Sequence, residues 1–135
     1  MAIERENAEI LSSFGELVVR RFDETLRNIN RKLSKKHDPV YNDFHEYIDK
    51  LPPQERLVRV AQDSLETFIH DFMAALDESH VYSIYARCAD GTLVDLKVVA
   101  LGNLHAEQLD WLDNFSENRS ISDIIYEIRD KNTKR

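Results

Sequence analysis

Cysteine, glycine and proline are scarce in this chain of 135 residues, which contains one Cys, three Gly and three Pro. The single cysteine, Cys88, permits no disulfide and no cysteine-based zinc site within one chain, and we expect it to be a small buried hydrophobic residue. Three glycines are too few for the common phosphate-binding loops, and no Gly-x-Ser-x-Gly sequence is present. These absences argue against the commonest nucleotide-binding and serine-hydrolase sites.

Long apolar runs are also missing. No segment approaches the length that spans a bilayer, and the charged start, Met1 to Glu6, lacks the apolar run of a secretory signal. We therefore expect a cytoplasmic protein with no membrane partner. Hydrophobic residues make up 42% of the chain, and twelve aromatic residues recur along it. This composition predicts one folded domain over 1–135, with fraying only at about 131–135.

Positive charge is in deficit, since the net charge is −7. The excess lies in the middle: residues 38–80 contain ten acidic and three basic side chains, whereas residues 1–37 contain eight basic and six acidic ones. A surface of this sign repels phosphate backbones and attracts basic partners, so no nucleic-acid partner is expected. One basic stretch is interpreted as helix-end charge that complements the backbone dipole: Arg27, Arg31, Lys32, Lys35 and Lys36.

Apolar residues at helical spacing predict a long first helix from Glu4 to about Leu33. About 30 residues would span about 45 Å, which exceeds the roughly 37 Å diameter of a compact sphere of this size. The helix must therefore bend near Ser12 to Gly15, or project and pack on a second chain. Asp38-Pro39 predicts the start of a short second helix, and Pro53 opens a third helix that runs to about Asp77.

After residue 80 the apolar period changes from 3.6 to 2, which predicts a hairpin of strands 81–88 and 92–101. A three-residue loop with a left-handed Gly91 pairs Cys88 with Thr92 and Ala86 with Val94. Two helices follow, and Ser120 is the expected cap of the last one. The predicted fold is a helix-dominated α+β domain in the order α-α-α-β-β-α-α, with the hairpin packed against a helical bundle.

Helices followed by a hairpin are also found in winged helix-turn-helix proteins. The predicted recognition helix, 53–77, is too long for that role and lies in the acidic section. The overlong first helix and the uncovered hairpin edge instead indicate a homodimer.

His70-Asp71 is an adjacent pair, and His45 lies 25 positions earlier, with further acidic residues downstream. This order resembles the His, His-Asp and Asp ligands of HD-type metal-dependent phosphohydrolases, which are all-helical. The resemblance covers three or four residues, and the predicted hairpin departs from it. It implies a hydrolase that holds a divalent metal with His45, His70 and Asp71. An exposed histidine on the polar face of the third helix is the alternative interpretation.

Acidic residues on the predicted polar faces of the second and third helices carry the favoured hypothesis, a non-enzymatic cytosolic protein-binding or regulatory module without a cofactor. Such a face would steer a basic partner toward it, in the manner of an immunity protein or antitoxin. Only composition suggests that comparison, and a solvated surface explains each carboxylate equally well. The candidate partner-binding residues are Asp43, Glu46, Asp63, Glu66 and Asp77.

Overall fold

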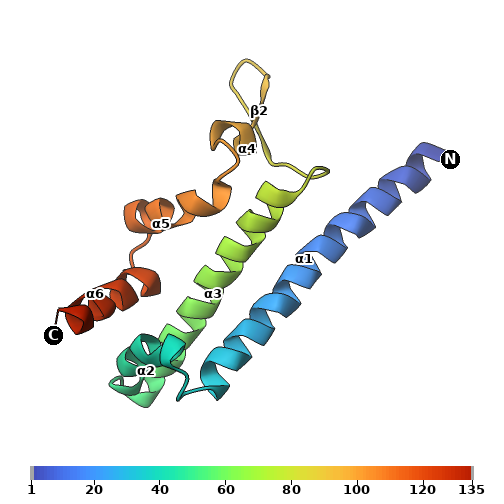
Figure 1. Cartoon of the computed structure of the whole chain (residues 1–135). Coiled ribbons are helices and arrows are strands. Elements are labelled where there is room, and N and C mark those ends of the chain that lie inside the picture. The colour runs from blue at the N-terminus through green and yellow to red at the C-terminus, as the bar shows by residue number, and fades with distance from the viewer. Residues whose placement is uncertain (1, 135) are drawn as a thin grey trace.

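The computed structural model describes residues 2–134 of the chain, and side chains from residue 4 on. This part forms six α-helices, one 3-10 turn and a two-stranded antiparallel hairpin, which confirms the expected helix-dominated α+β fold and its order of helices, hairpin and helices (Figure 1). The elements are α1 (Ala2–Ser34), η1 (Pro39–Tyr41), α2 (Asn42–Asp49), α3 (Pro53–Glu78), β1 (Tyr85–Arg87), β2 (Leu93–Asp95), α4 (Leu96–Val99), α5 (Leu104–Phe115) and α6 (Ile121–Thr133).

The two longest helices, α1 and α3, run antiparallel beside one another (Figure 1). Aromatic contacts join them: the ring centroids of Phe14 and Phe72 are 6.4 Å apart, and those of Phe22 and Phe68 are 6.3 Å apart. Gly15 lies inside the uninterrupted helix α1, so the alternative of a bend there is not realised. At 1.5 Å per residue α1 is about 50 Å long, about 10 Å longer than α3.

Side chains of known capping type mark the predicted helix boundaries. The Asp38 carboxylate accepts a hydrogen bond from the Val40 N–H, 3.1 Å away, and thereby starts η1, which leads into α2. Pro53 is the first residue of α3, as expected. The Arg56 guanidinium donates to the carbonyls of Ile48, Asp49 and Leu51 and so satisfies the end of α2.

The last helix begins at the predicted cap and ends later than expected. The Ser120 hydroxyl accepts a hydrogen bond from the Asp123 N–H at 3.1 Å, which confirms the capping arrangement. The helix α6 continues to Thr133, past residue 131, at which fraying was expected to begin. The Asn132 amide donates to carboxylates of α2 and holds this last turn in place. Arg135 lies outside the described residues.

The hairpin has the predicted register but shorter strands. Ala86 pairs with Val94, the Cys88 N–H donates to the Thr92 carbonyl at 2.8 Å, and Gly91 has a φ of 87°. The expectation that the second strand continues to residue 101 is wrong. The Asp95 carboxylate accepts the Lys97 N–H at 2.9 Å and starts the helical turn α4 instead, because β propensity alone does not outweigh a helix cap.

The hairpin tip extends away from the helices, and only its base is attached to them (Figure 1). At the base the Tyr82 ring lies 5.3 Å from the Phe14 ring, and its hydroxyl donates to the Ile10 carbonyl at 3.2 Å. Cys88 is exposed, so the expected buried position is wrong. No helix face covers this part of the hairpin, which explains why its small apolar side chain meets solvent.

The buried hydrophobic residues of the described chain form a small core in two parts. Phe44, Ile48 and Ile121 belong to α2 and the start of α6. The other part comes from the end of α3 and the start of α5, and consists of Ala75, Leu76 and Leu104. None of the described helices has the length and apolar character that would let it cross a membrane.

Candidate functional site

Asp63 was expected on an exposed face of α3, but only 9% of its surface is accessible. Its carboxylate forms an ion pair with Lys32 of α1, with a distance of 2.9 Å between the nitrogen and the oxygen. The Lys32 ammonium also lies 4.5 Å from the centre of the Phe44 ring. This residue of the basic stretch therefore joins α1 to α3, and Lys36 from the same stretch is paired with Asp49.

Glu66 is also buried, with 8% of its surface accessible. Both of its carboxylate oxygens accept the N–H of Ile121, the first residue of α6, at 2.9 and 3.3 Å. Gln62 donates a further hydrogen bond at 3.0 Å. Burial raises the pKa of Glu66 above its ordinary value, and the bonds from Gln62 and Ile121 only partly oppose this increase. Glu66 therefore supplies an acceptor to the N-terminus of α6.

Asp77 plays the same part for α5. Its side chain is 6% accessible and accepts hydrogen bonds from the N–H groups of Leu104 and His105, at 2.8 and 3.0 Å, and from the His105 ring at 2.5 Å. Burial alone would raise the pKa of Asp77, but the bonds from His105 and Leu104 outweigh it and lower the pKa. The expected exposure of Asp77 is therefore wrong, and the residue holds the start of α5.

The two acidic residues of α2 contact the last helix. Asp43 accepts hydrogen bonds from Arg129 and Asn132, both at 3.1 Å. Glu46 accepts one from Asn132 at 3.0 Å, and this bond is the main cause of its lowered pKa. Asp43 and Glu46 remain partly accessible to solvent, but each is already bonded to α6.

All five carboxylates selected from the sequence thus hold helices together. The polar face of α3 was expected to meet water. It instead meets α1, α5 and α6, whose charged side chains and N-terminal N–H groups need acceptors. Carboxylates three or four residues apart on a helix give the same sequence pattern whether their face meets solvent or other helices. The pattern alone therefore did not distinguish a solvated face from a buried one.

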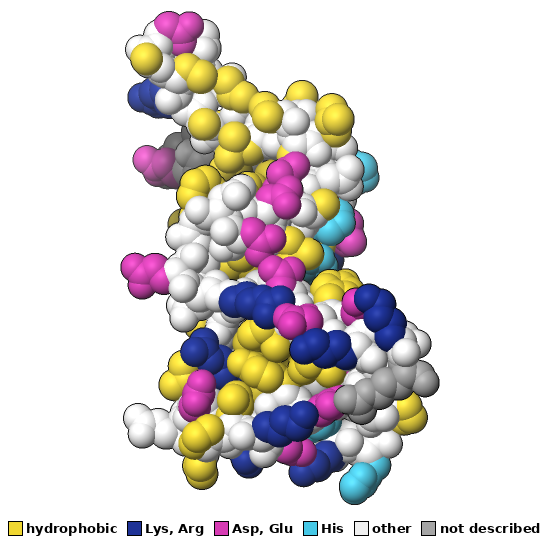
Figure 2. All heavy atoms as spheres, turned by 90° about the vertical axis from the view of Figure 1, so that its left-hand side faces the viewer, with side chains coloured by type: hydrophobic (Ala, Val, Ile, Leu, Met, Phe, Trp, Pro, Cys, Tyr) yellow, Lys and Arg dark blue, Asp and Glu magenta, His cyan; other side chains and the backbone are white. Residues whose placement is uncertain are grey.

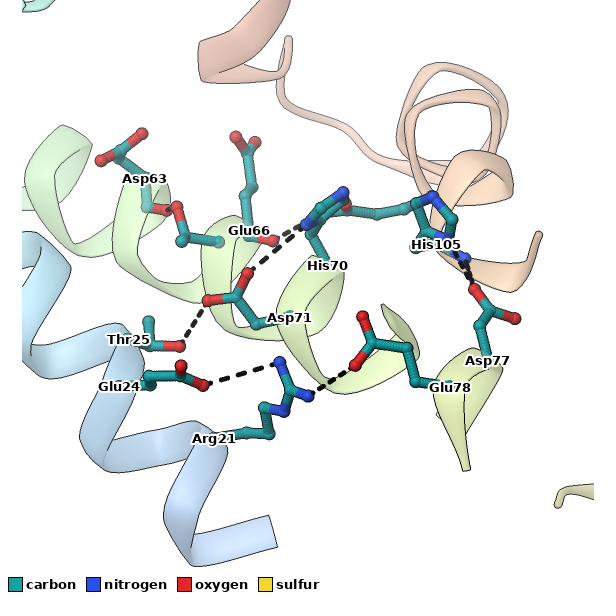
Figure 3. A network of polar contacts seen from close by, with 12 residues as sticks. Arg21, Glu24, Thr25, Asp63, Glu66, His70, Asp71, Asp77, Glu78 and His105 are labelled. Atoms are coloured by element: carbon teal, nitrogen blue, oxygen red, sulfur yellow. Dashed lines mark hydrogen bonds and ion pairs between the residues drawn. The ribbon is translucent and has the colours of Figure 1, made fainter. Parts of the chain in front are cut away.

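The histidines do not form the site that the hydrolase resemblance implies. His45 is buried, and its Nε2 lies 2.8 Å from the Lys32 carbonyl near the end of α1. His70 lies next to Asp71, at 3.5 Å, and its ring meets the His105 ring edge-on at 5.5 Å (Figure 3). Within residues 2–134, no three His, Cys, Asp or Glu side chains are placed to hold a metal ion.

Figure 3 shows how the polar groups of α3 divide between its neighbours. Asp71 is directed toward α1, where it accepts a hydrogen bond from the buried Thr25 hydroxyl at 2.7 Å. Asp77 is directed toward His105 at the start of α5. The contact between His70 and His105 was not predicted, because nothing in the spacing of the two residues indicates that α5 lies beside α3.

A polar cleft runs between α3 and α6. It consists of two adjoining hollows of about 260 and 270 Å³ that share Asp63, Ser122 and Tyr126. The charged groups that line the first hollow, Lys32 with Asp63 and Arg129 with its partner on α2, are already paired with one another or with neighbours. The first hollow is therefore balanced in charge and singles out no ionic ligand.

The first half of the apolar stripe of α3 faces solvent, although Asp63 and Glu66 on the polar face of the same helix are buried. Leu57 is 73% accessible and Leu65 is 65% accessible, and Val58 and Ile69 are exposed beside them. Between α3 and α5 the stripe opens into a largely apolar groove of about 420 Å³. Contiguous exposed apolar patches of this kind are uncommon on monomeric proteins.

A second apolar row on α1 continues this stripe. The row consists of residues at helical spacing that are all exposed, namely Leu11, Val19, Phe22, Leu26 and Leu33. The contact between Phe22 and Phe68 places this row on the same side of the helix pair as the stripe of α3, opposite the side on which Lys32 meets Asp63. We call the two rows together the α1/α3 apolar face.

The area of the chain agrees with this picture. Its accessible surface is 9916 Å², whereas a compact monomer of 15.8 kDa is expected to expose about 7,300 Å². The excess is about 2,600 Å². Part of this excess reflects the elongated arrangement of the two long helices (Figure 1). Another part comes from the apolar side chains that these helices expose.

The side of the molecule formed by α5 and α6 has a different surface. Figure 2 shows acidic and basic side chains interspersed over the half that contains α2 and α6, and hydrophobic side chains gathered over the hairpin end. The exposed apolar residues of that end include Val81, Tyr85, Leu93, Val98, Val99 and Leu101. The hairpin and α4 lie at the far end of the molecule from α2 (Figure 1).

Comparison of the chain with protein-family models, with curated proteins and with solved structures finds no match.

Proposed function

We propose that this chain is a non-enzymatic protein-binding module and that it binds through the α1/α3 apolar face. The observation that carries the proposal is the exposure of two parallel rows of large apolar side chains on the two longest helices. Rows at this spacing are the surfaces that helices use to bind other helices. Such a face has no catalytic groups, and its contribution to binding is the burial of apolar area.

This proposal keeps the protein partner expected from the sequence and changes the surface. A basic partner captured by acidic residues, as in an immunity protein or antitoxin, would need accessible carboxylates. Asp63, Glu66 and Asp77 are instead bonded inside the fold. The net charge of −7 still favours the approach of basic over acidic proteins through its long-range field.

Site-specific photo-crosslinking in the native cells tests the proposal. A photoreactive residue replaces Leu65, at the centre of the apolar stripe, or Asn28, an exposed position on the other flank of α1. We expect discrete protein adducts from position 65 and none from position 28. Absence of any adduct at position 65, or equal adducts at both positions, would show that the apolar face does not bind protein.

A further inference from the structure

We infer that the α1/α3 apolar face is covered by a second copy of this chain, in a two-fold dimer that forms a four-helix bundle. This inference rests on the proposed function, because it identifies the protein that the face binds. It places α1 of each copy against α3 of its partner.

The exposed area fits a dimer. The excess over a compact monomer is about 2,600 Å² per chain. Interfaces of obligate homodimers bury roughly 1,000 to 2,500 Å² on each partner. The excess, part of which reflects the elongated arrangement, is therefore large enough to include an interface of this size. A single docked helix would fill the groove between two rows and leave their outer sides in water.

The shape of the face points in the same direction. Two antiparallel helices with one apolar side make up half of a four-helix bundle, and two such pairs packed face to face complete it. A two-fold axis uses the same patch on both copies, so no second binding surface has to exist on either chain. The cleft between α3 and α6 is lined by Lys32 and Asp63, on the side of the helix pair away from this face, and stays accessible in the dimer.

Charge distinguishes the two ways in which the helix pairs can meet. Residues 1–37, which contain α1, have more basic than acidic side chains, whereas residues 38–80, which contain α3, are strongly acidic. The helix α1 itself has six basic and six acidic side chains, and α3 has two basic and six acidic ones. Packing α1 against α3 of the partner therefore keeps the two acidic α3 helices apart, whereas packing α1 against α1 sets them against each other. The rows themselves are apolar and carry no opposing charge.

Sedimentation velocity on the purified full-length chain tests the dimer. We expect twice the chain mass of 15.8 kDa at micromolar concentration. Leu65→Glu and Leu26→Glu should each raise the dissociation constant at least about 100-fold, because each buries an unpaired charge in the interface. The matched control Asn28→Glu adds the same charge to an exposed position of α1 outside the face and should remain dimeric.

Should a glutamate variant fail to fold, cross-linking decides. In a Cys88→Ser background, a Leu26→Cys chain is mixed with a Leu65→Cys chain of different mass and treated with a short bismaleimide. Each chain then has one thiol, so a mixed product reports contact between α1 and α3 of different copies. We expect that product, and none when Asn28→Cys replaces Leu26→Cys.

Two results would overturn the inference: a monomer at all concentrations up to about 100 µM, or a dimer that neither Glu variant weakens. A monomer combined with an adduct to a different protein at position 65 overturns the dimer and leaves the proposed function intact. A monomer without any adduct overturns both.

Discussion

Glu66 in the middle of α3 accepts a hydrogen bond from the backbone of Ile121, the first residue of α6, across 55 positions of sequence. Asp77, further along α3, does the same for Leu104 at the start of α5. Side chains of α3 thus cap the N-termini of α5 and α6. Because a helix N-terminus without acceptors is costly once buried, α5 and α6 depend on α3 for their position as well as for their packing.

Asp77→Asn should lower the free energy of unfolding by about 2 kcal/mol at pH 7, because buried N–H groups lose a charged acceptor. The pKa of Asp77 is lowered from its ordinary value of 3.8 in the folded chain. Its contribution is therefore complete above pH 3.8 and is lost as the pH falls through the lowered pKa. Urea unfolding at several pH values below 5 should show a shallower acid decline in the variant. Asp110→Asn, at an exposed position of α5, should behave as the native chain does.

Glu66→Gln should show the opposite pH dependence. Burial raises the pKa of Glu66 from its ordinary value of 4.5, so its contribution is most favourable below pH 4.5 and declines as the pH rises through the raised pKa. The stability of the native chain relative to the variant should therefore fall between pH 4 and pH 7. A relative gain over that range would contradict the assignment. Glu55→Gln, at an exposed position of the same helix, is the control.

Lys32 and Asp63 should prove strongly coupled. Their side chains are 24% and 12% accessible, so removing one leaves a charge in a poorly solvated place. We expect Lys32→Met and Asp63→Leu each to cost about 3 kcal/mol and the double variant to cost much less than their sum. A double-mutant cycle by chemical denaturation measures this coupling, and additive effects would show that the ion pair is solvated.

Two glycines should respond oppositely to alanine. Gly15 lies within α1 with no atom near the position of an added Cβ, so Gly15→Ala should raise stability by about 0.5 to 1 kcal/mol. Gly91 has a φ of 87° in the hairpin loop, which strains any residue with a side chain. Gly91→Ala should leave the melting temperature nearly unchanged and should speed amide exchange at Cys88, whose N–H pairs across the loop. Loss of global stability in that variant would show that the hairpin is part of the core.

Helix positions, proline boundaries and hairpin register were predictable because each depends on neighbours in the sequence. Asp38, Pro53 and Ser120 act within three residues of themselves, and Gly91 sets the pairing of the residues on either side of it. The end of β2 was not predicted, because β-branched Val98 and Val99 favour a strand while Asp95 caps a helical turn through its own side chain.

The face that each helix buries was predicted less well. The apolar stripe of α3 is exposed in its first half, at Leu57, Val58 and Leu65, and is buried only toward its end, at Leu76, while the polar side is covered at Asp63 and Glu66. Periodicity shows that a helix has two sides. It does not show which one meets the rest of the chain, since that depends on where α5 and α6 return, and on what covers the other side.

The hairpin is joined to the helices at its base, near Tyr82, and its tip stands clear of them. Chain length at the tip is therefore free to vary without displacing any helix. A peptide inserted between Asp90 and Gly91 would be displayed at the end of a hairpin of three residue pairs. The fold can therefore present different peptides at that position while the helices stay the same.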